Sequence, residues 1–228
     1  MTEVNLAAVS LRELNGQLHA LPADTNETLW KVANPGGKHA IACGLTLPIS
    51  VEIDGHVGYY CAGMNAEASV TISGNAGVGV AENMMSGTVT VKGDASQAAG
   101  ATGHGGLLLI EGNAAARCGI SMKGIDIVVK GSIGPMSAFM AQAGNLVVLG
   151  NAGEALGDSI YEARLFVRGE VKSLGADCIA KEMTAEDRGA LQSVLARAGI
   201  HDVATDEFKL YGSARNLYHF HVDNVDAY

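Results

Sequence analysis

Residues 70–77 read VTISGNAG, and the same pattern returns nineteen residues later as VTVKGDAS (89–96) and again as LLIEGNAA (108–115). A glycine keeps this spacing through seven successive copies without an insertion: Gly55, Gly74, Gly93, Gly112, Gly131, Gly150 and Gly169. Self-similarity at a fixed period is typical of solenoid architectures. The fold is therefore inferred first from the repeat, and single residues are interpreted within it.

Each repeat glycine follows a short segment with alternating aliphatic residues. The positions two and four residues before the glycines are aliphatic in every copy, and most are β-branched. This pattern predicts a strand with one buried face that ends in a turn. Strands that return every nineteen residues must stack in parallel, because the interval leaves no room for a crossover helix. The sequence thus predicts an all-β fold, a right-handed parallel β-helix of seven coils, roughly 34 Å long.

Polar residues follow the glycines in every copy. They are His56, Asn75, Asp94, Asn113, Ser132, Asn151 and Glu170. Asn, Asp and Ser bond to neighbouring backbone groups, and Asn and Asp also tolerate a left-handed conformation. Stacked side-chain amides can continue a hydrogen-bond ladder along a solenoid axis. We therefore expect a polar ladder at this corner of the coil.

The flanks of the repeat predict two caps. Leucines with helical spacing follow Ser10, an N-cap residue, so residues 1–50 are expected to form an N-terminal helix and a degenerate coil. The parallel β-helix is expected over residues 51–183. A C-terminal helix that starts at Thr184 and ends near Gly199, followed by an extended tail, is expected over residues 184–228.

Composition argues against several classes of partner. The net charge is −9 and the 15 Lys and Arg are scattered, so no basic stripe is available for nucleic acid. No apolar stretch approaches the ~20 residues that span a bilayer, and the N-terminus lacks a signal-peptide pattern. We expect a cytoplasmic protein with no nucleic-acid and no membrane partner.

The cysteines do not have the spacing of a metal site. No two of them are closer than eighteen positions, namely Cys43, Cys61, Cys118 and Cys178. Zinc and iron–sulfur sites need closely spaced pairs. Two of the four occupy one column of the predicted solenoid, but three coils separate them by about 14 Å, which is beyond disulfide reach. They are expected to be small core residues or free thiols.

Isolated polar residues form no reactive constellation in the sequence. His104 has no nucleophile or second ligand at a defined spacing. The glycine-rich segments 77–79 and 100–106 lack the helix N-terminus that a phosphate loop needs. His219 and His221 alternate as a metal pair would, but no third ligand is indicated. We expect no catalytic, cofactor-binding or metal-binding residue in this chain.

One outward row of the predicted solenoid is apolar. Three positions before the glycines, polar residues in the first three coils give way to apolar residues in the last four, Leu109, Val128, Val147 and Phe166. Strand alternation places this row on the outer surface, where such a stripe is not left in water. The row is a candidate interface, and we expect the segment from Thr184 onward, a partner subunit, or both to cover it.

The motifs GNAG (74–77), GNA (112–114), GNAG (150–153) and GHVG (55–58), within coils of this length, resemble the GXGXG domain of the glutamate synthase large subunit. The resemblance covers residues 51 to about 183. The ending LYHF (217–220) is similar to the tail of stand-alone versions of this domain. Over its full length the chain most resembles the small β-helix subunit of N-methylglutamate synthase, a glutamate synthase-like protein.

This resemblance implies a non-catalytic scaffold subunit in a hetero-oligomer. It would join a glutamine amidotransferase-like subunit to an FMN-dependent glutamate synthase-like subunit, and the FMN and iron–sulfur clusters are expected in that partner. The complex would convert methylamine and L-glutamate to N-methyl-L-glutamate and ammonia, a transferase and oxidoreductase role in methylamine metabolism. The alternative family is the β-helix subunit of formylmethanofuran dehydrogenase, or of the related formyltransferase/hydrolase complex, which shares the same solenoid.

Other classes of solenoid protein fit the sequence less well. A polysaccharide lyase would carry long irregular loops with Asp, Arg and Lys in a groove, whereas the seven copies follow one another without an insertion. A hexapeptide acyltransferase divides its coils into sixes, which nineteen does not allow. A filament-forming protein would not be expected to have flanking caps. The repeat therefore favours the scaffold hypothesis.

Overall fold

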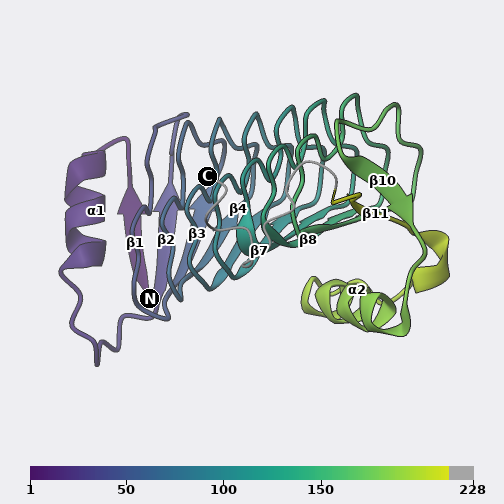
Figure 1. Cartoon of the computed structure of the whole chain (residues 1–228). Helices are drawn as coiled ribbons and strands as arrows, with labels where there is room; N and C mark the ends of the chain where they lie inside the picture. The colour runs from purple at the N-terminus through teal and green to yellow at the C-terminus, as the bar shows by residue number, and fades with distance from the viewer. Residues whose placement is uncertain (216–228) are drawn as a thin grey trace, which may run out of the picture.

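The computed structural model describes residues 1–215 and shows a parallel β-solenoid of about seven turns with two short α-helices (Figure 1). Its described strands form one sheet in the order β1-β2-β3-β4-β5-β6-β7-β8-β9-β11-β10. The strands are β1 Thr2–Asn5, β2 Leu29–Ala33, β3 Ser50–Asp54, β4 Ser69–Ile72, β5 Thr88–Val91, β6 Leu107–Ile110, β7 Lys123–Val129, β8 Ala143–Val148, β9 Arg164–Val167, β10 Cys178–Lys181 and β11 Lys209–Ser213. The predicted all-β solenoid is confirmed.

The strands of the repeat keep the register that the spacing predicts. From β3 to β9 the strands pair nineteen residues apart, as Val51 does with Val70 and Val70 with Val89. The exception is the start of β7, where Lys123 lies opposite Ala143 and the register shifts before Asp126. The aliphatic residues two and four positions before the glycines all point inward and are buried in one continuous core. A second row of parallel bridges, from Val57 to Val171, forms another side of the coil.

The parallel sheet begins earlier than residue 51. Strand β2 pairs in parallel with β3, and β1 pairs in parallel with β2. Leu29 lies opposite Ser50, an offset of 21 residues, so this coil does not follow the nineteen-residue period. It also lacks the repeat glycine, which is why the period does not reveal its strand. The degenerate coil expected in residues 1–50 is nevertheless present.

A third side of each coil is built from backbone that alternates in handedness. We call it the αL side and define it as residues 59–64, 78–83, 97–102, 116–121, 135–140 and 154–159. In the first of these segments Tyr60, Ala62 and Met64 have φ of 59°, 53° and 55°. Their N–H groups donate in turn to the next coil, the previous coil and the next coil, at 2.7–2.9 Å. The backbone of this side is thus hydrogen-bonded although it is not a β-strand.

Helix α1 (Leu11–His19) closes the N-terminal end of the solenoid (Figure 1). The Ser10 side chain accepts a hydrogen bond from the Glu13 N–H, as the N-cap prediction requires. Leu14 and Leu18 are buried in the solenoid core. Asn15 bonds two backbone groups of the first coil, because its Nδ2 donates to the Ala40 carbonyl and its Oδ1 accepts from the Ala42 N–H.

The C-terminal end departs from the parallel stack. Strand β11 inserts between β9 and β10 and is antiparallel to both. Helix α2 (Ala185–Arg197) starts after Thr184, which forms a capping box with Asp187, and Gly199 follows its end with φ of 70°. A short 3-10 helix, η1 (Thr205–Glu207), leads from α2 into β11. The expected tail with His219 and His221 lies outside the described residues.

Candidate functional site

The polar residues after the repeat glycines form a ladder of hydrogen bonds along the axis. In each coil the backbone N–H of this residue donates to the side chain of its counterpart one coil earlier. The six bonds are Asn75 to His56, Asp94 to Asn75, Asn113 to Asp94, Ser132 to Asn113, Asn151 to Ser132 and Glu170 to Asn151, at 2.7–3.0 Å. The predicted ladder is present, and its six bonds join side chains to backbone. A side-chain pair adds to it, because Asn113 Nδ2 donates to Asp94 Oδ1 at 3.2 Å. None of these residues has a positive φ, so their tolerance of that conformation is not used.

The ladder explains why glycine stands before it. A Cβ on Gly93 would lie 2.1 Å from Asn75 Oδ1, and a Cβ on Gly112 would lie 2.3 Å from Asp94 Oδ1. Only Gly55 of the seven repeat glycines has a positive φ. Glycine is therefore required by the close approach of the ladder acceptors and of the previous coil's backbone. The repeat uses its polar side chains as structural acceptors.

The candidate interface residues lie in a second hydrophobic core on the outer face of the sheet. Val128, Val147 and Phe166 are fully buried and Leu109 is nearly so. The side chains that cover them come from α2 and the segment after it, namely Leu191, Val194, Leu195, Phe208 and Leu210. The sequence predicted that the C-terminal segment, a partner subunit, or both would cover these residues, and the structure shows the C-terminal segment in this place. A partner subunit could contact these four side chains only if α2 moved away.

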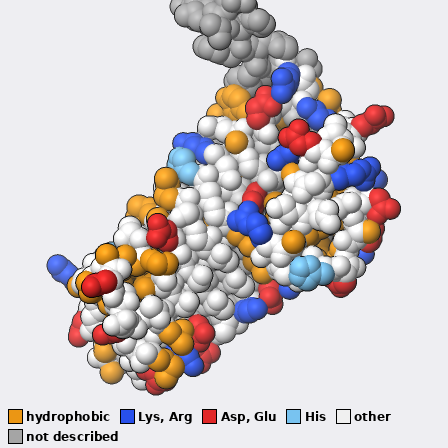
Figure 2. Space-filling model, turned by 90° about the horizontal axis from the view of Figure 1, so that it is seen from below, with side chains coloured by type: hydrophobic (Ala, Val, Ile, Leu, Met, Phe, Trp, Pro, Cys, Tyr) orange, Lys and Arg blue, Asp and Glu red, His pale blue; other side chains and the backbone are white. Residues whose placement is uncertain are grey.

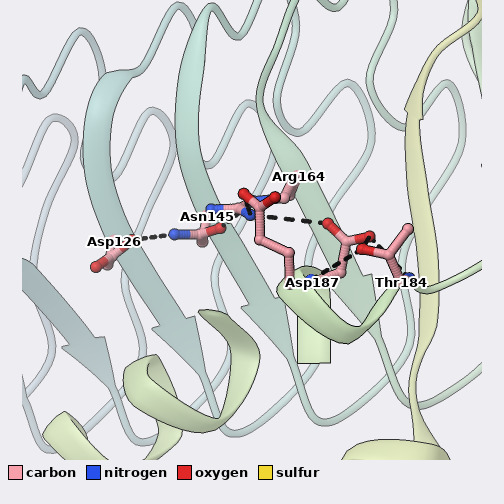
Figure 3. Close-up of polar contacts among 6 residues, drawn as sticks. Asp126, Asn145, Arg164, Thr184 and Asp187 are labelled. Carbon is pink, nitrogen blue, oxygen red and sulfur yellow. Dashed lines mark hydrogen bonds and ion pairs between the residues drawn. The ribbon is translucent and has the colours of Figure 1, made fainter. Parts of the chain in front are cut away.

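A row of polar side chains runs beside this second core, across β7, β8 and β9 (Figure 3). Asn145 Nδ2 donates to Asp126 Oδ1 at 2.6 Å, and Arg164 Nε donates to Asn145 Oδ1 at 2.9 Å. Asp126 and Asn145 are both buried. The row was not predicted from the sequence. Its signal was the position five residues before each glycine, which changes from Ser or Thr in the first coils to Asp, Asn and Arg in the last ones.

The polar row holds both ends of α2. Arg197 in its last turn pairs with Asp126 Oδ2, and Arg164 lies 3.7 Å from Asp187 in its first turn. Burial raises the pKa of Asp187, but hydrogen bonds from Thr184 and the Arg164 charge outweigh it, so the pKa lies below its ordinary value. The row therefore acts as a clamp that positions α2 over the second core. Figure 2, seen from below, shows Lys, Arg, Asp and Glu side chains spread over the outer surface of this C-terminal part.

A known protein is similar to this chain over its full length. No protein-family model matches the chain. The chain is 62% identical over 228 residues to Protein GlxC of Rhizobium meliloti (strain 1021), and the alignment covers 100% of both chains. The chain belongs to the GlxC family. The alignment spans both flanks as well as the repeats.

The residues considered as possible catalytic, phosphate-binding or metal-binding groups lie apart from one another in this member of the GlxC family. His104 is exposed at a corner of the coil. Within residues 1–215 no group of three His, Cys, Asp or Glu side chains could hold a metal ion. In the same residues no helix is long and apolar enough to cross a membrane. The glycine-rich segments 77–79 and 100–106 lie mostly on the αL side and its following corner, and each is followed by a strand and not by a helix.

The four cysteines are free thiols with suppressed ionisation. Burial raises the pKa of Cys118 to about 12, and burial together with the nearby Asp177 charge raises that of Cys178 to about 12. Burial also raises the pKa of Cys61, and that of the partly exposed Cys43, whose Sγ donates a hydrogen bond to the Tyr60 carbonyl. At neutral pH these thiols are protonated and are weak nucleophiles.

Two shallow hollows open on the outer face of the sheet. One, of about 740 Å³, lies over β1 to β4 and has Glu3, Lys31 and Glu52 in its lining. The other, of about 610 Å³, lies between the β8–β9 region and β10–β11, with Arg164 and Lys181 in its lining. Charges of both signs line each hollow. Neither hollow shows the convergent set of groups that a reaction centre needs.

Proposed function

We propose that this chain is a non-catalytic scaffold subunit of a cytoplasmic, glutamate-synthase-like complex, most specifically of N-methylglutamate synthase. In this proposal it joins a glutamine amidotransferase-like subunit to a synthase subunit that holds FMN and iron–sulfur clusters. The complex makes N-methyl-L-glutamate from methylamine and L-glutamate and releases ammonia. The chain contributes no reacting group, and its role is to place the two partners relative to each other.

The main support for this proposal is that the polar residues of the repeat form hydrogen bonds that hold the fold together. The acceptors that follow the glycines, such as Asn75 and Asp94, bond to the backbone of the next coil. The buried pair Asp126 and Asn145 holds α2 through Arg197 and Arg164. Polar groups that are engaged in this way stabilise a shape and are not free to bind a substrate. A capped solenoid without long loops is a rigid body with several flat sides, which suits a subunit that holds others in place.

The resemblance of the GXGXG motifs supports the choice of complex. The motifs at 55–58, 74–77, 112–114 and 150–153 all lie at the ladder corner, where the structure needs glycine followed by an acceptor. Because glycine and an acceptor are needed at this corner in any solenoid of this kind, the motif does not specify a substrate. The choice of methylamine rests on the full-length resemblance. A complex of the formylmethanofuran dehydrogenase type is the competing assignment.

Purification of the tagged chain from its source, with identification of the polypeptides that accompany it, tests the proposal. An amidotransferase-like chain and a flavoprotein should be recovered in fixed ratio, and the complex should show FMN and iron–sulfur absorption. It should convert L-glutamate and methylamine to N-methyl-L-glutamate and release one ammonia for each methylamine consumed. The isolated chain should be colourless. A stoichiometric flavin spectrum from this chain alone, or recovery of formylmethanofuran dehydrogenase-type subunits, would contradict it.

A further inference from the structure

Two tyrosines form an exposed aromatic surface on the αL side near the N-terminal end. Tyr59 and Tyr60 are each 49% exposed, and their rings meet edge to face with centroids 6.4 Å apart. His39 stacks on Tyr59 with centroids 4.5 Å apart. Met64 and Met85 are 56% and 50% exposed, and the Met85 N–H bonds to the carbonyl of the residue after Met64. We call these five residues the tyrosine patch.

The next coil holds the two rings in place by means of glycines. A Cβ on Gly77 would lie 3.0 Å from Tyr59 Cδ1, and a Cβ on Gly79 would lie 2.7 Å from Tyr60 Cδ1. The rings thus lie along the solenoid axis against bare backbone. Side chains that are already ordered lose less conformational entropy when a partner binds. The patch is therefore arranged for contact before any partner arrives.

The fold itself does not require a tyrosine at position 60. Its φ of 59° is unfavourable for a bulky residue. Four of the equivalent positions in other coils have small residues in the same conformation, namely Ala40, Gly79, Ala98 and Ala155. The residue is half exposed. A large aromatic side chain that is strained and half exposed indicates a role outside the packing of the chain.

The charges around the patch indicate what it binds. A Cβ on Gly79 would lie 2.8 Å from Glu82 Oε2 and 2.8 Å from Tyr60 Cε1. The Glu82 carboxylate therefore adjoins the Tyr60 ring. Glu82 forms no ion pair with the residues that the structure describes. In the segments 59–64, 78–83, 97–102, 116–121 and 135–140, only Glu82 and Arg117 are charged. Few charges, together with exposed Tyr and Met, are typical of the centre of a protein interface.

We propose that the tyrosine patch is the docking surface for a different protein chain that places an arginine side chain between Tyr60 and Glu82. A guanidinium stacks on an aromatic face and pairs with a carboxylate at the same time. Apolar side chains of the partner lie on Met64 and Met85. A second copy of this chain suits the patch less well, because it would bring two Glu82 carboxylates into one interface without supplying an arginine from the same patch. The inference rests on the proposed function only for the identity of the partner.

Site-specific crosslinking in the full complex tests this inference. The tagged chain is produced in its source with a photoreactive phenylalanine at position 60 or, as the control, at Thr90 on the outer face of the sheet. We expect a crosslink to another polypeptide from position 60 and none from the control. Tyr60→Ala and Glu82→Arg should each lower recovery of that polypeptide at least tenfold, while Thr90→Ala leaves it unchanged. Tyr60→Ala should melt within a few degrees of the parent chain, since alanine occupies equivalent positions.

A charge exchange identifies the arginine. Among the residues of the crosslinked partner peptide, an Arg→Glu change should restore recovery by the Glu82→Arg chain and weaken recovery by the parent chain. A crosslink to a second copy, unchanged recovery with both variants, or no partner at all would overturn the inference. If the expected subunits are recovered equally by every variant, the patch fails and the proposed function stands. If the patch binds a polypeptide of another class, the proposed function fails and the patch stands.

Discussion

Replacing Gly93 by alanine should destabilise the solenoid by about 2–4 kcal/mol. The new Cβ would lie 2.1 Å from Asn75 Oδ1 and 3.0 Å from the Gly74 backbone. The amide of Asn75 must leave its place, which breaks the 2.9 Å bond from the Asp94 N–H, and the loss of one such bond costs about 1 kcal/mol. The crowding that remains against the previous coil costs about 1–3 kcal/mol, as overpacking does elsewhere.

A double substitution separates the two contributions. Asn75→Ala alone removes the ladder bond and should cost about 1 kcal/mol. In the chain with both Asn75→Ala and Gly93→Ala the ladder bond is lost only once while the crowding against the Gly74 backbone remains, so the total should be about 2–4 kcal/mol and not the sum of the single effects. Gly16→Ala in α1 is the matched control. Nothing lies within 4 Å of its Cβ, and alanine in a helix should stabilise by about 0.5–1 kcal/mol.

Guanidinium unfolding followed by two independent probes measures these differences. Two probes are needed because a solenoid can unfold in parts rather than as a single unit. Because the same hydrogen bond is lost in both single variants, the coupling between the substitutions should be negative and about 1 kcal/mol. Additive effects within about 0.5 kcal/mol would refute it, and so would a destabilising Gly16→Ala of the same size.

Three further predictions concern α2 and the thiols. Phe166→Glu buries a charge beneath α2, so it should raise hydrogen exchange across residues 184–213 and weaken assembly. Thr71→Glu in the same row should change stability by about 0.5 kcal/mol or less. Equal effects of the two variants would contradict this. Asp126→Ala leaves the buried Asn145 amide without its acceptor and removes the ion pair of the half-exposed Arg197, and it should cost about 2 kcal/mol, with faster exchange confined to α2. Unchanged exchange would show that the clamp is unimportant. Because the folded pKa values of Cys61 and Cys118 are raised, the contribution of these thiols to stability should be constant below about pH 8.5 and fall by about 1.4 kcal/mol per thiol per pH unit above it. Denaturant midpoints at pH 8 and 10 measure this decline, and a chain with alanine at both positions should show a smaller one.

The sequence by itself determined the solenoid and its core. Each coil bonds to the coils nineteen residues away, so one set of contacts recurs six times between seven coils, and the recurrence is visible as the spacing from Gly55 to Gly169. The inward rows, the polar ladder and both helix starts, at Ser10 and Thr184, follow from periodic or local rules. Such contacts need no knowledge of distant parts of the chain.

The tertiary structure alone decided how the ends and the outer face are completed. The insertion of β11 between β9 and β10, and the ion pair of Arg197 with Asp126, join residues that no repeat relates. The hydrophobic pattern could mark the stripe that ends at Phe166 as a surface to be covered, but not choose between α2 and a partner. The αL side was hidden for a different reason. Its backbone alternates between right- and left-handed conformations, and this alternation leaves no strand or helix period in the sequence. Only the tertiary structure shows that Tyr60 lies beside Glu82 on its surface.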